Sequence, residues 1–527
     1  MIRFWVSGEY SISTAFSKTR NDSCKIAIKH VAPNYLPSEL HSFRSLSIME
    51  KEAPVKVSCE EDLILSSVIT HDDQRKLEKS MLRKMDIVIL PVVAWVYLIA
   101  YLDRSNIGNA QSAGLSESLG LSSSQYSAAV SLFYVTYILV ETPCTIIFKK
   151  TRPSLVLAIL SATWSLVGLF AGFIKNYAGL LVIRLLLGAI EGGLFPCLAL
   201  YLATVYKREE LAYRMSYLFA AAALAGAIGG LLAYGLLMMD GTDGKEGWRW
   251  LFIIEGCISF TGAICVIGCL PNRMETAWFL NEQERQYFIR RKEESEKTYR
   301  EDEESIEDVK SAFKDPKVYL SAVSQFCAEV VFYGFSTFLP QIIKAMGHST
   351  LSTQALTVPV YVVGAISFIL IAAASDYTNR RLPFLVGAAI FPIVGYIILL
   401  SANGNGAKMG GVYVLTIGAF AGPGLNLSWI NNNTGGHLKR AASVGIQLSI
   451  ANVAGVVIGQ IYRSNDFPKF TLGHGFSLGC ISFAIFSYIV QAWYLSTQNK
   501  KKQRRRESGE VDTSKRGDNS DEFIYMI

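Results

Sequence analysis

The sequence predicts an all-α membrane protein with about twelve transmembrane helices, divided six and six. Of its 527 residues, 51% are hydrophobic and 18% are charged, and the mean hydropathy is +0.29. A soluble chain of this length would have charge on about a quarter of its residues. The apolar residues also gather in blocks of roughly 20, the length at which a helix crosses about 30 Å of hydrocarbon. A long charged segment, 272–317, separates the sixth block from the seventh.

The chain begins with a polar, Ser-rich stretch that has no hydrophobic periodicity. Such a composition cannot bury enough apolar surface to offset the entropy of ordering, so we predict a disordered cytoplasmic tail over residues 1–80. The first thirty residues include basic side chains but no apolar core, which argues against a secretory signal. Met1 and Met49 are both possible starts of the protein.

The twelve predicted spans follow from block length and polarity. We expect an N-terminal six-helix bundle over 81–270, a cytoplasmic central loop over 271–317, a C-terminal six-helix bundle over 318–496 and a cytoplasmic tail over 497–527. The approximate spans are 84–110, 124–148, 154–174, 178–206, 213–238, 249–270, 318–343, 354–375, 382–401, 411–433, 440–462 and 473–496.

Charge in the loops predicts the orientation. With the amino terminus placed in the cytoplasm, the short inner loops contain more Lys and Arg than the outer loops, as the positive-inside rule requires. An even number of spans then places the carboxyl terminus in the cytoplasm as well. We expect a multi-pass protein of the plasma membrane, with an internal membrane as the alternative.

Several function classes are disfavoured by the sequence. Basic residues cluster at the ends of apolar blocks rather than on a soluble module, so we expect no nucleic-acid partner. Most of the 9 Cys lie inside apolar blocks without a CxxC pair, which argues against disulfides, a zinc site or any other metal. No HExxH or GxSxG motif is present, and His437 and His474 fall on opposite sides of the predicted membrane. We therefore expect neither an enzyme nor a bound cofactor.

Ionisable residues inside the predicted spans are the main functional signal. Each costs roughly 2.5–3.5 kcal/mol at the bilayer centre on insertion scales, so few are tolerated without a partner or a role. They are Asp103, Arg104, Glu141, Arg184, Glu191, Glu255 and Glu329.

The spacing of these residues places some of them on shared helix faces. Arg184 and Glu191 are seven residues apart, close to two helical turns, and point the same way. Tyr97, Tyr101 and Arg104 form one polar and aromatic stripe. Tyr333 lies one turn beyond Glu329 in the seventh span, and Asn426 and Trp429 share the tenth. Such charges could simply neutralise each other and lock two helices together, or they could line a binding cavity.

Several motifs in these spans resemble the major facilitator superfamily, and more closely its anion:cation symporter family in the fungal allantoate permease branch. The resemblance extends from about Arg83 to Gln498. Its specific parts are YLDRSNIGNA (101–110), RLLLGAIEGGLFP (184–196), YKREELAYR (206–214), GWRWLFIIEG (247–256), DYTNRR (376–381) and GHG (473–475).

This resemblance implies two six-helix bundles around a central cavity, with alternating access. It makes Asp103 and Glu191 candidates for proton coupling and Arg104 and Arg184 candidates for the anion site. We expect the helix to continue through Tyr101–Ala110 and to hold Asp103 and Arg104 inside the cavity. Other candidate substrate-binding residues are Tyr97, Tyr101, Glu329, Tyr333, Asn426 and Trp429.

The resemblance also implies a gate at the cytoplasmic loop between spans eight and nine. Asp376, Arg380 and Arg381 are the candidate gating residues. The corresponding loop of the first half, 143–152, has no Asp. We therefore expect the gate contact to be stronger in the second half.

The expected function is secondary active import of a small organic anion, such as a ureide or a vitamin acid, by proton symport in a monomer embedded in the bilayer. The branch handles ureides, vitamins such as nicotinate, biotin and pantothenate, short peptides and sulfur compounds, and the sequence does not choose among them. The alternative is a nutrient sensor that uses the transporter fold with little flux, since the central segment and tails could bind signalling partners.

Overall fold

The computed structural model describes residues 71–301, 306–509 and 517–527, and within them it is helical with no strand. The N-terminal half comprises α3 (His71–Ser112), α4 (Leu115–Leu119), α5 (Ser123–Lys150), α6 (Pro153–Ala171), α7 (Tyr177–Val205), α8 (Arg208–Leu237) and α9 (Gly247–Cys269). The C-terminal half comprises α12 (Pro316–Lys344), α13 (Thr350–Thr378), α14 (Leu382–Ser401), α15 (Asn405–Ala419), α16 (Ala421–Asn432), α17 (His437–Ile461) and α18 (Thr471–Glu507). Between the halves lie α10 (Glu282–Glu301) and α11 (Ile306–Lys314).

Eleven of the described helical segments are long and apolar enough to cross a membrane, and α8, with its apolar stretch Leu224–Leu237, occupies the twelfth position. One of these spans consists of α15 and α16 together, joined at Phe420. Large apolar side chains such as Leu139, Ile267 and Leu370 are exposed on the outer helix faces. Such faces suit contact with lipid, and together with the eleven membrane-length helices they confirm the predicted all-α membrane fold.

Polar residues mark where several of these helices begin. Ser122 accepts a hydrogen bond from the Gln125 amide (3.3 Å), and the Gln125 side chain accepts one from the Ser122 amide (2.9 Å), which makes a capping box at the start of α5. At the start of α7, the Asn176 side chain accepts a single hydrogen bond from the Gly179 amide at 2.9 Å. These caps satisfy backbone groups that a helix end leaves unpaired.

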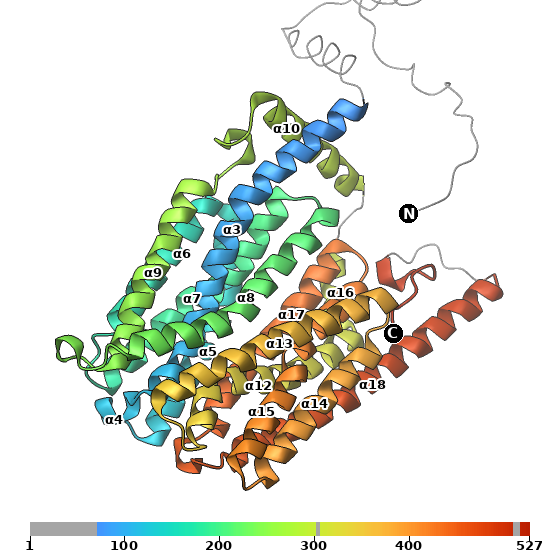
Figure 1. Cartoon of the computed structure of the whole chain (residues 1–527). Helices are drawn as coiled ribbons and strands as arrows, with labels where there is room; N and C mark the ends of the chain where they lie inside the picture. The colour runs from blue at the N-terminus through green and yellow to red at the C-terminus, as the bar shows by residue number, and fades with distance from the viewer. Residues whose placement is uncertain (1–70, 302–305, 510–516) are drawn as a thin grey trace, which may run out of the picture. The chain divides into compact units, whose positions relative to one another are not determined.

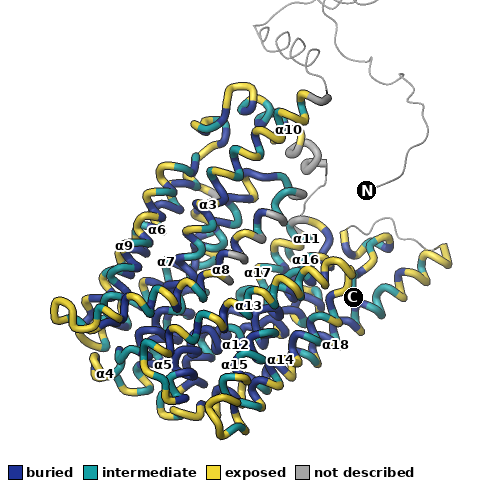
Figure 2. The backbone as a smooth tube through the Cα atoms, in the orientation of Figure 1, coloured by how far each residue is buried: buried dark blue, intermediate teal, exposed yellow. Residues whose placement is uncertain are grey.

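Each half is a bundle, and among the described residues three helix pairs make the most extensive contacts between the halves (Figure 1). Within the N-terminal half α5 packs on α7, α6 on α9 and α3 on α8; within the C-terminal half α12 packs on α17 and α18, and α14 on α15. The joining pairs are α8 with α13, α5 with α17 and α3 with α12. Figure 2 shows mostly dark blue, buried residues where α12 lies, and α12 is the most buried of the described spans.

The chain alternates between two ends of the bundle. We call them the α10 end, where α3 begins and α18 finishes, and the α4 end, where α3 finishes and α5 begins (Figure 1). In the predicted orientation the α10 end faces the cytoplasm.

The predicted N-terminal tail requires a correction. Residues 1–70 lie outside the described residues, but 71–80 are the first turns of α3 rather than disordered chain. Hydropathy misses these turns because they are polar and amphipathic. Helix α10 packs beside them: Glu284 accepts hydrogen bonds from Ser80 and Lys84, both at 2.8 Å, and Arg291 pairs with Glu78 at 3.5 Å.

The predicted central loop and C-terminal tail also contain structure. Residues 271–317 include α10, α11 and the first residues of α12. Helix α18 continues past the predicted boundary at 496 to Glu507, and residues 517–527 pack back onto the C-terminal half.

Candidate functional site

A cavity lies between the two halves and has about 930 Å³ of empty volume, part of it open to solvent. Helices α3, α5 and α7 form its wall in the N-terminal half, and α12, α13, α16 and α17 form its wall in the C-terminal half. Its polar lining residues are Tyr97, Tyr101, Arg104, Tyr137, Glu141, Gln325, Glu329, Tyr333 and Asn452. Its aromatic walls with a few polar groups suit a small molecule.

Arg104 is the cation in the cavity lining, and it comes from the C-terminal part of α3. Its Nη2 lies 3.7 Å from Oε2 of Glu191 on α7. The guanidinium also lies 4.9 Å from the ring centre of Tyr137 and 5.9 Å from that of Phe133. Aromatic faces attract a cation without neutralising it, so Arg104 keeps charge available for an anion.

Glu191 is buried, and neither of its carboxylate oxygens accepts a hydrogen bond from the described residues. It lies where α7 packs closely on α5. A side chain at Gly188 would collide with the backbone oxygen of Phe133, and one at Gly192 with the Tyr137 backbone. The glycines beside Glu191 therefore make room for a neighbouring helix rather than for a ligand.

Arg184 shares the face of α7 with Glu191 but does not line the cavity. Its Nε donates a hydrogen bond to the backbone oxygen of Ala129 at 3.2 Å, and its guanidinium lies 4.3 Å from the ring centre of Phe133. These contacts tie α7 to α5 and give Arg184 a place in the packing of the N-terminal half.

Asp103 also lies outside the cavity lining, which corrects the expectation that it accompanies Arg104 there. Helix α3 does continue through Ser112, but neighbouring residues on a helix point about 100° apart. Asp103 therefore turns into the N-terminal half. Its Oδ1 accepts a hydrogen bond from Asn106 at 3.2 Å, and the same amide group donates to Oε2 of Glu255 on α9.

Asp103, Asn106 and Glu255 are all buried, and among the described residues neither carboxyl group forms an ion pair with a lysine or arginine. Two buried carboxyl groups that share one amide donor repel each other when both are ionised.

The described residues contain no group of three or more His, Cys, Asp or Glu that could hold a metal ion.

The C-terminal half contributes the predicted Glu329 and Tyr333 to the cavity. Oε1 of Glu329 accepts a hydrogen bond from Gln325 at 3.2 Å. The Tyr333 hydroxyl donates to Asn452 at 3.2 Å, and the Asn452 amide donates to Oε2 of Glu141 at 3.3 Å. This chain of contacts crosses from α12 through α17 to α5 and so joins the two halves at the cavity.

Aromatic side chains make most of the remaining wall. Tyr97 lies 5.2 Å from Phe195 and Tyr101 lies 6.1 Å from Phe332, measured between ring centres. Phe332 lies 5.1 Å from Phe420. The tyrosines were predicted from their spacing with Arg104. The phenylalanines were missed because a phenylalanine in an apolar span gives no signal that separates a cavity wall from a lipid face.

Asn426 and Trp429 are buried and do not line the cavity, which corrects the expectation that they contact the substrate. Asn426 donates to the backbone oxygen of Ser321 at 2.9 Å and to Gln325 at 2.8 Å. Trp429 donates to the backbone oxygen of Met526 at 2.9 Å. Asn426 thus positions Gln325 behind the cavity wall, whereas Trp429 holds the end of the chain.

The predicted gating residues lie at the α10 end, where α13 turns into α14. Arg381 pairs with Asp376 at 2.6 Å and donates to Ser375 at 2.9 Å. Arg380 is exposed, and its backbone oxygen accepts a hydrogen bond from Ser375 at 2.9 Å.

Contacts between the halves close the cavity on the side of the α4 end. Gln341 donates to the Tyr126 hydroxyl at 3.1 Å, and Gln354 donates to the Ser112 hydroxyl at 2.9 Å. Glycines allow the helices to meet there. A side chain at Gly108 would collide with the Thr337 backbone.

Comparison with known proteins agrees with this architecture. Residues 93–460 match the model of the Major Facilitator Superfamily. An uncharacterized transporter of Schizosaccharomyces pombe is 49% identical over 452 residues, which cover 86% of this chain and 91% of the relative. The high-affinity nicotinic acid transporter of Saccharomyces cerevisiae is 37% identical over 457 residues, 85% of each chain. A crystal structure of a D-xylose-proton symporter has a TM-score of 0.60 at 14% identity, covering 77% of this chain and 97% of that one.

Proposed function

The chain belongs to the Major Facilitator Superfamily, and on that premise we propose that it imports a small organic anion together with a proton. It is an integral multi-pass membrane protein. Within the superfamily we assign it to the anion:cation symporter family, in the fungal allantoate permease branch. We place it in the plasma membrane as a monomer with both termini in the cytoplasm.

The observation that supports this function best is the pairing of Arg104 with Glu191 beside the cavity. The pair is 3.7 Å apart and largely shielded from water, so its attraction is stronger than on a protein surface. Protonation of Glu191 would remove that attraction and leave the Arg104 charge for a substrate carboxylate. Binding of the proton and of the anion would then favour each other, which is the requirement for symport.

The rest of the lining favours an aromatic or similarly flat carboxylate. Arg104 offers a planar fork for the carboxylate, and the rings of Tyr97, Phe195 and Phe332 offer flat apolar walls. Gln325 and Asn452 add amide groups on the opposite side. The nicotinic acid transporter among the relatives makes nicotinate the first substrate to test.

The test is uptake of radiolabelled nicotinate by yeast cells that lack their own nicotinic acid transporter. We expect uptake in acidic medium that is abolished by a protonophore and lost in Arg104→Ala. Arg463→Ala is the matched control, because Arg463 is an exposed arginine at the α4 end. Nicotinamide has the same ring without the carboxylate and should neither enter nor compete.

Three results separate the parts of the proposal. Undiminished uptake in Arg104→Ala would show that Arg104 does not bind the anion. Uptake of nicotinamide as fast as nicotinate would contradict an anion transporter. If another acid, such as pantothenate or allantoate, enters in an Arg104-dependent manner, the assignment of the anion site stands and only the identity of the substrate changes.

A further inference from the structure

The carboxyl-terminal segment 517–527 is docked on the α10 end of the C-terminal half. It begins with a short 3₁₀ turn, Gly517–Asn519, and ends at Ile527. Asp518 and Asp521 are each 1% exposed, and Tyr525 is 7% exposed. A freely solvated tail would not bury its acidic side chains in this way.

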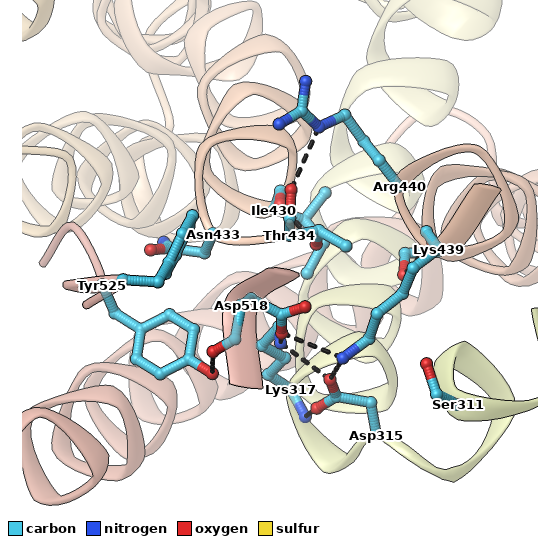
Figure 3. Close-up of polar contacts among 12 residues, drawn as sticks. Ser311, Asp315, Lys317, Ile430, Asn433, Thr434, Lys439, Arg440, Asp518 and Tyr525 are labelled. Atoms are coloured by element: carbon cyan, nitrogen blue, oxygen red, sulfur yellow. Dashed lines mark hydrogen bonds and ion pairs between the residues drawn. The ribbon is translucent and has the colours of Figure 1, made fainter. Parts of the chain in front are cut away.

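Figure 3 shows Asp518 and Asp315 opposite the ammonium groups of Lys317 and Lys439. Lys439 lies 2.9 Å from Asp518 and 2.7 Å from Asp315, and Lys317 pairs with the same two carboxylates. Both lysines are buried. Although burial pushes the pKa of Asp315 up, Lys317 and Lys439 hold it below its usual range.

The docked segment supplies the second carboxylate that faces Lys317 and Lys439, and its backbone oxygens accept hydrogen bonds from a third buried lysine, Lys502. Two buried lysines then face two carboxylates. Without Asp518, Lys317 and Lys439 would share Asp315 alone, and one buried cation would lack compensation. The buried lysines at the starts of α12 and α17 therefore form a site for an acidic segment, and the chain's own terminus occupies it.

Two asparagines fix the backbone of the last residues. Asn433 donates to the backbone oxygen of Met526 at 2.9 Å and accepts from its amide at 2.7 Å. Asn499 makes the same two-way contact with Tyr525, both bonds at 2.9 Å. Gly435 allows close approach, because a side chain there would collide with the backbone of Gly517 and Asp518. Such paired bonds specify one register of the segment.

The end of the segment reaches the predicted gate. The Arg381 amide donates to the backbone oxygen of Ile527 at 3.3 Å, and the side chain of the same arginine pairs with Asp376. The segment thus contacts α12, α16, α17, α18 and the α13–α14 turn at once.

We propose that residues 517–527 are an intramolecular clasp that holds these helices together at the α10 end and fixes the Arg381 turn. The clasp makes the C-terminal half move as one body and controls how readily the gate residues rearrange. Displacement of the segment, by a modification or by a competing acidic peptide, would loosen the gate. This role is independent of which substrate is transported.

Hydrogen exchange followed by mass spectrometry tests the clasp on the purified full-length protein in lipid nanodiscs. We expect Asp518→Asn to speed exchange about tenfold in peptides that contain Asn433, Arg381 and the segment itself, because local opening becomes easier. Exchange in α3–α9 should stay unchanged. Glu522→Gln is the matched control, since it removes an exposed acid from the same segment.

The double variant Asp518→Asn/Lys439→Gln leaves Lys317 paired one-to-one with Asp315 and should return exchange most of the way to the native rate. Three results would overturn the proposal: native exchange rates in Asp518→Asn, an equal effect of Glu522→Gln, or an increase that spreads through α3–α9. Tyr525→Phe provides a milder variant, because it removes only the hydrogen bond from the Tyr525 hydroxyl to the Asp518 backbone oxygen. It should give a smaller increase in the same peptides.

Discussion

Arg104 and Arg184 have different surroundings, although the sequence made both candidates for the anion site. Arg104 lines the cavity and pairs with Glu191, whereas Arg184 donates to a backbone oxygen of α5 inside the N-terminal half. A substrate anion in the cavity can reach the first guanidinium and not the second. Arg184 therefore has a structural role in positioning α7, and with it Glu191.

Replacement of each arginine by lysine distinguishes these roles. Arg104→Lys keeps the charge but loses the planar fork that matches a carboxylate, so we expect KM for nicotinate to rise roughly 10- to 100-fold. Arg184→Lys should lower the amount of folded protein and leave KM within about twofold of the native value. Uptake kinetics normalised to surface protein measure both effects. An unchanged KM in Arg104→Lys would argue against direct contact with the carboxylate.

At the scale of single residues, five of the candidate site residues predicted from the sequence line the cavity and several others do not. Tyr97, Tyr101, Arg104, Glu329 and Tyr333 do line the cavity. Asp103 was misplaced because adjacency in sequence puts it on a different face of α3 from Arg104. Glu141 was noted as an ionisable residue of its span but was not a candidate site residue, because its link to Asn452 on α17 depends on a pairing of helices that no single-helix pattern reveals.

At the scale of helices, small residues decide how the two halves meet. On α8, a side chain at Gly230 would collide with Thr357 and approach Val358 to 3.1 Å, both on α13. A Cβ atom at Gly235 on the same helix would meet no other group within 4 Å. A side chain at Gly226 would likewise collide with the ring of Tyr361 on α13. The close approach of α8 and α13 therefore depends on Gly226 and Gly230 but not on Gly235.

Leucine at Gly230 and at Gly235 tests the contact. Gly230→Leu should keep the α4 end from closing, and we expect the maximal uptake rate to fall about tenfold or more because overpacking forces the helices apart. Substrate binding to the purified protein should persist, since the cavity lining is intact. Gly235→Leu, at an exposed position, should transport at the native rate. Equal loss in both variants would point to a general effect on α8 instead.

Hydropathy located the helices well and their ends less well. Each predicted span corresponds to a described helical segment, because a run of about twenty apolar residues has few alternatives in a membrane. The extension of α3 to His71 and of α18 to Glu507 was not predicted. Both extensions are polar, and tertiary contacts stabilise them: α10 packs on the first, and Lys502 on the second donates to the backbone oxygen of Phe523 at 2.9 Å.

At the scale of the whole molecule, the site is divided between the two halves. Arg104 and Glu191 come from the N-terminal half, and Gln325, Glu329 and Tyr333 come from the C-terminal half. Rocking of one half against the other would separate these walls and expose the cavity at each end in turn, as in other transporters built from repeats. The halves are braced differently at the α10 end: α10 packs on α3 in one, and the clasp joins α12, α16, α17 and α18 in the other.

We propose that protonation of Glu191 releases Arg104 for the substrate anion. The most direct measurement compares two activities of Glu191→Gln in proteoliposomes: exchange of labelled for unlabelled nicotinate without a gradient, and accumulation of nicotinate driven by a pH gradient. Glutamine imitates the protonated acid, so we predict exchange within about twofold of native and no accumulation. Glu117→Gln, at an exposed acid on α4, should keep both activities. Accumulation by Glu191→Gln at the native level would contradict the account.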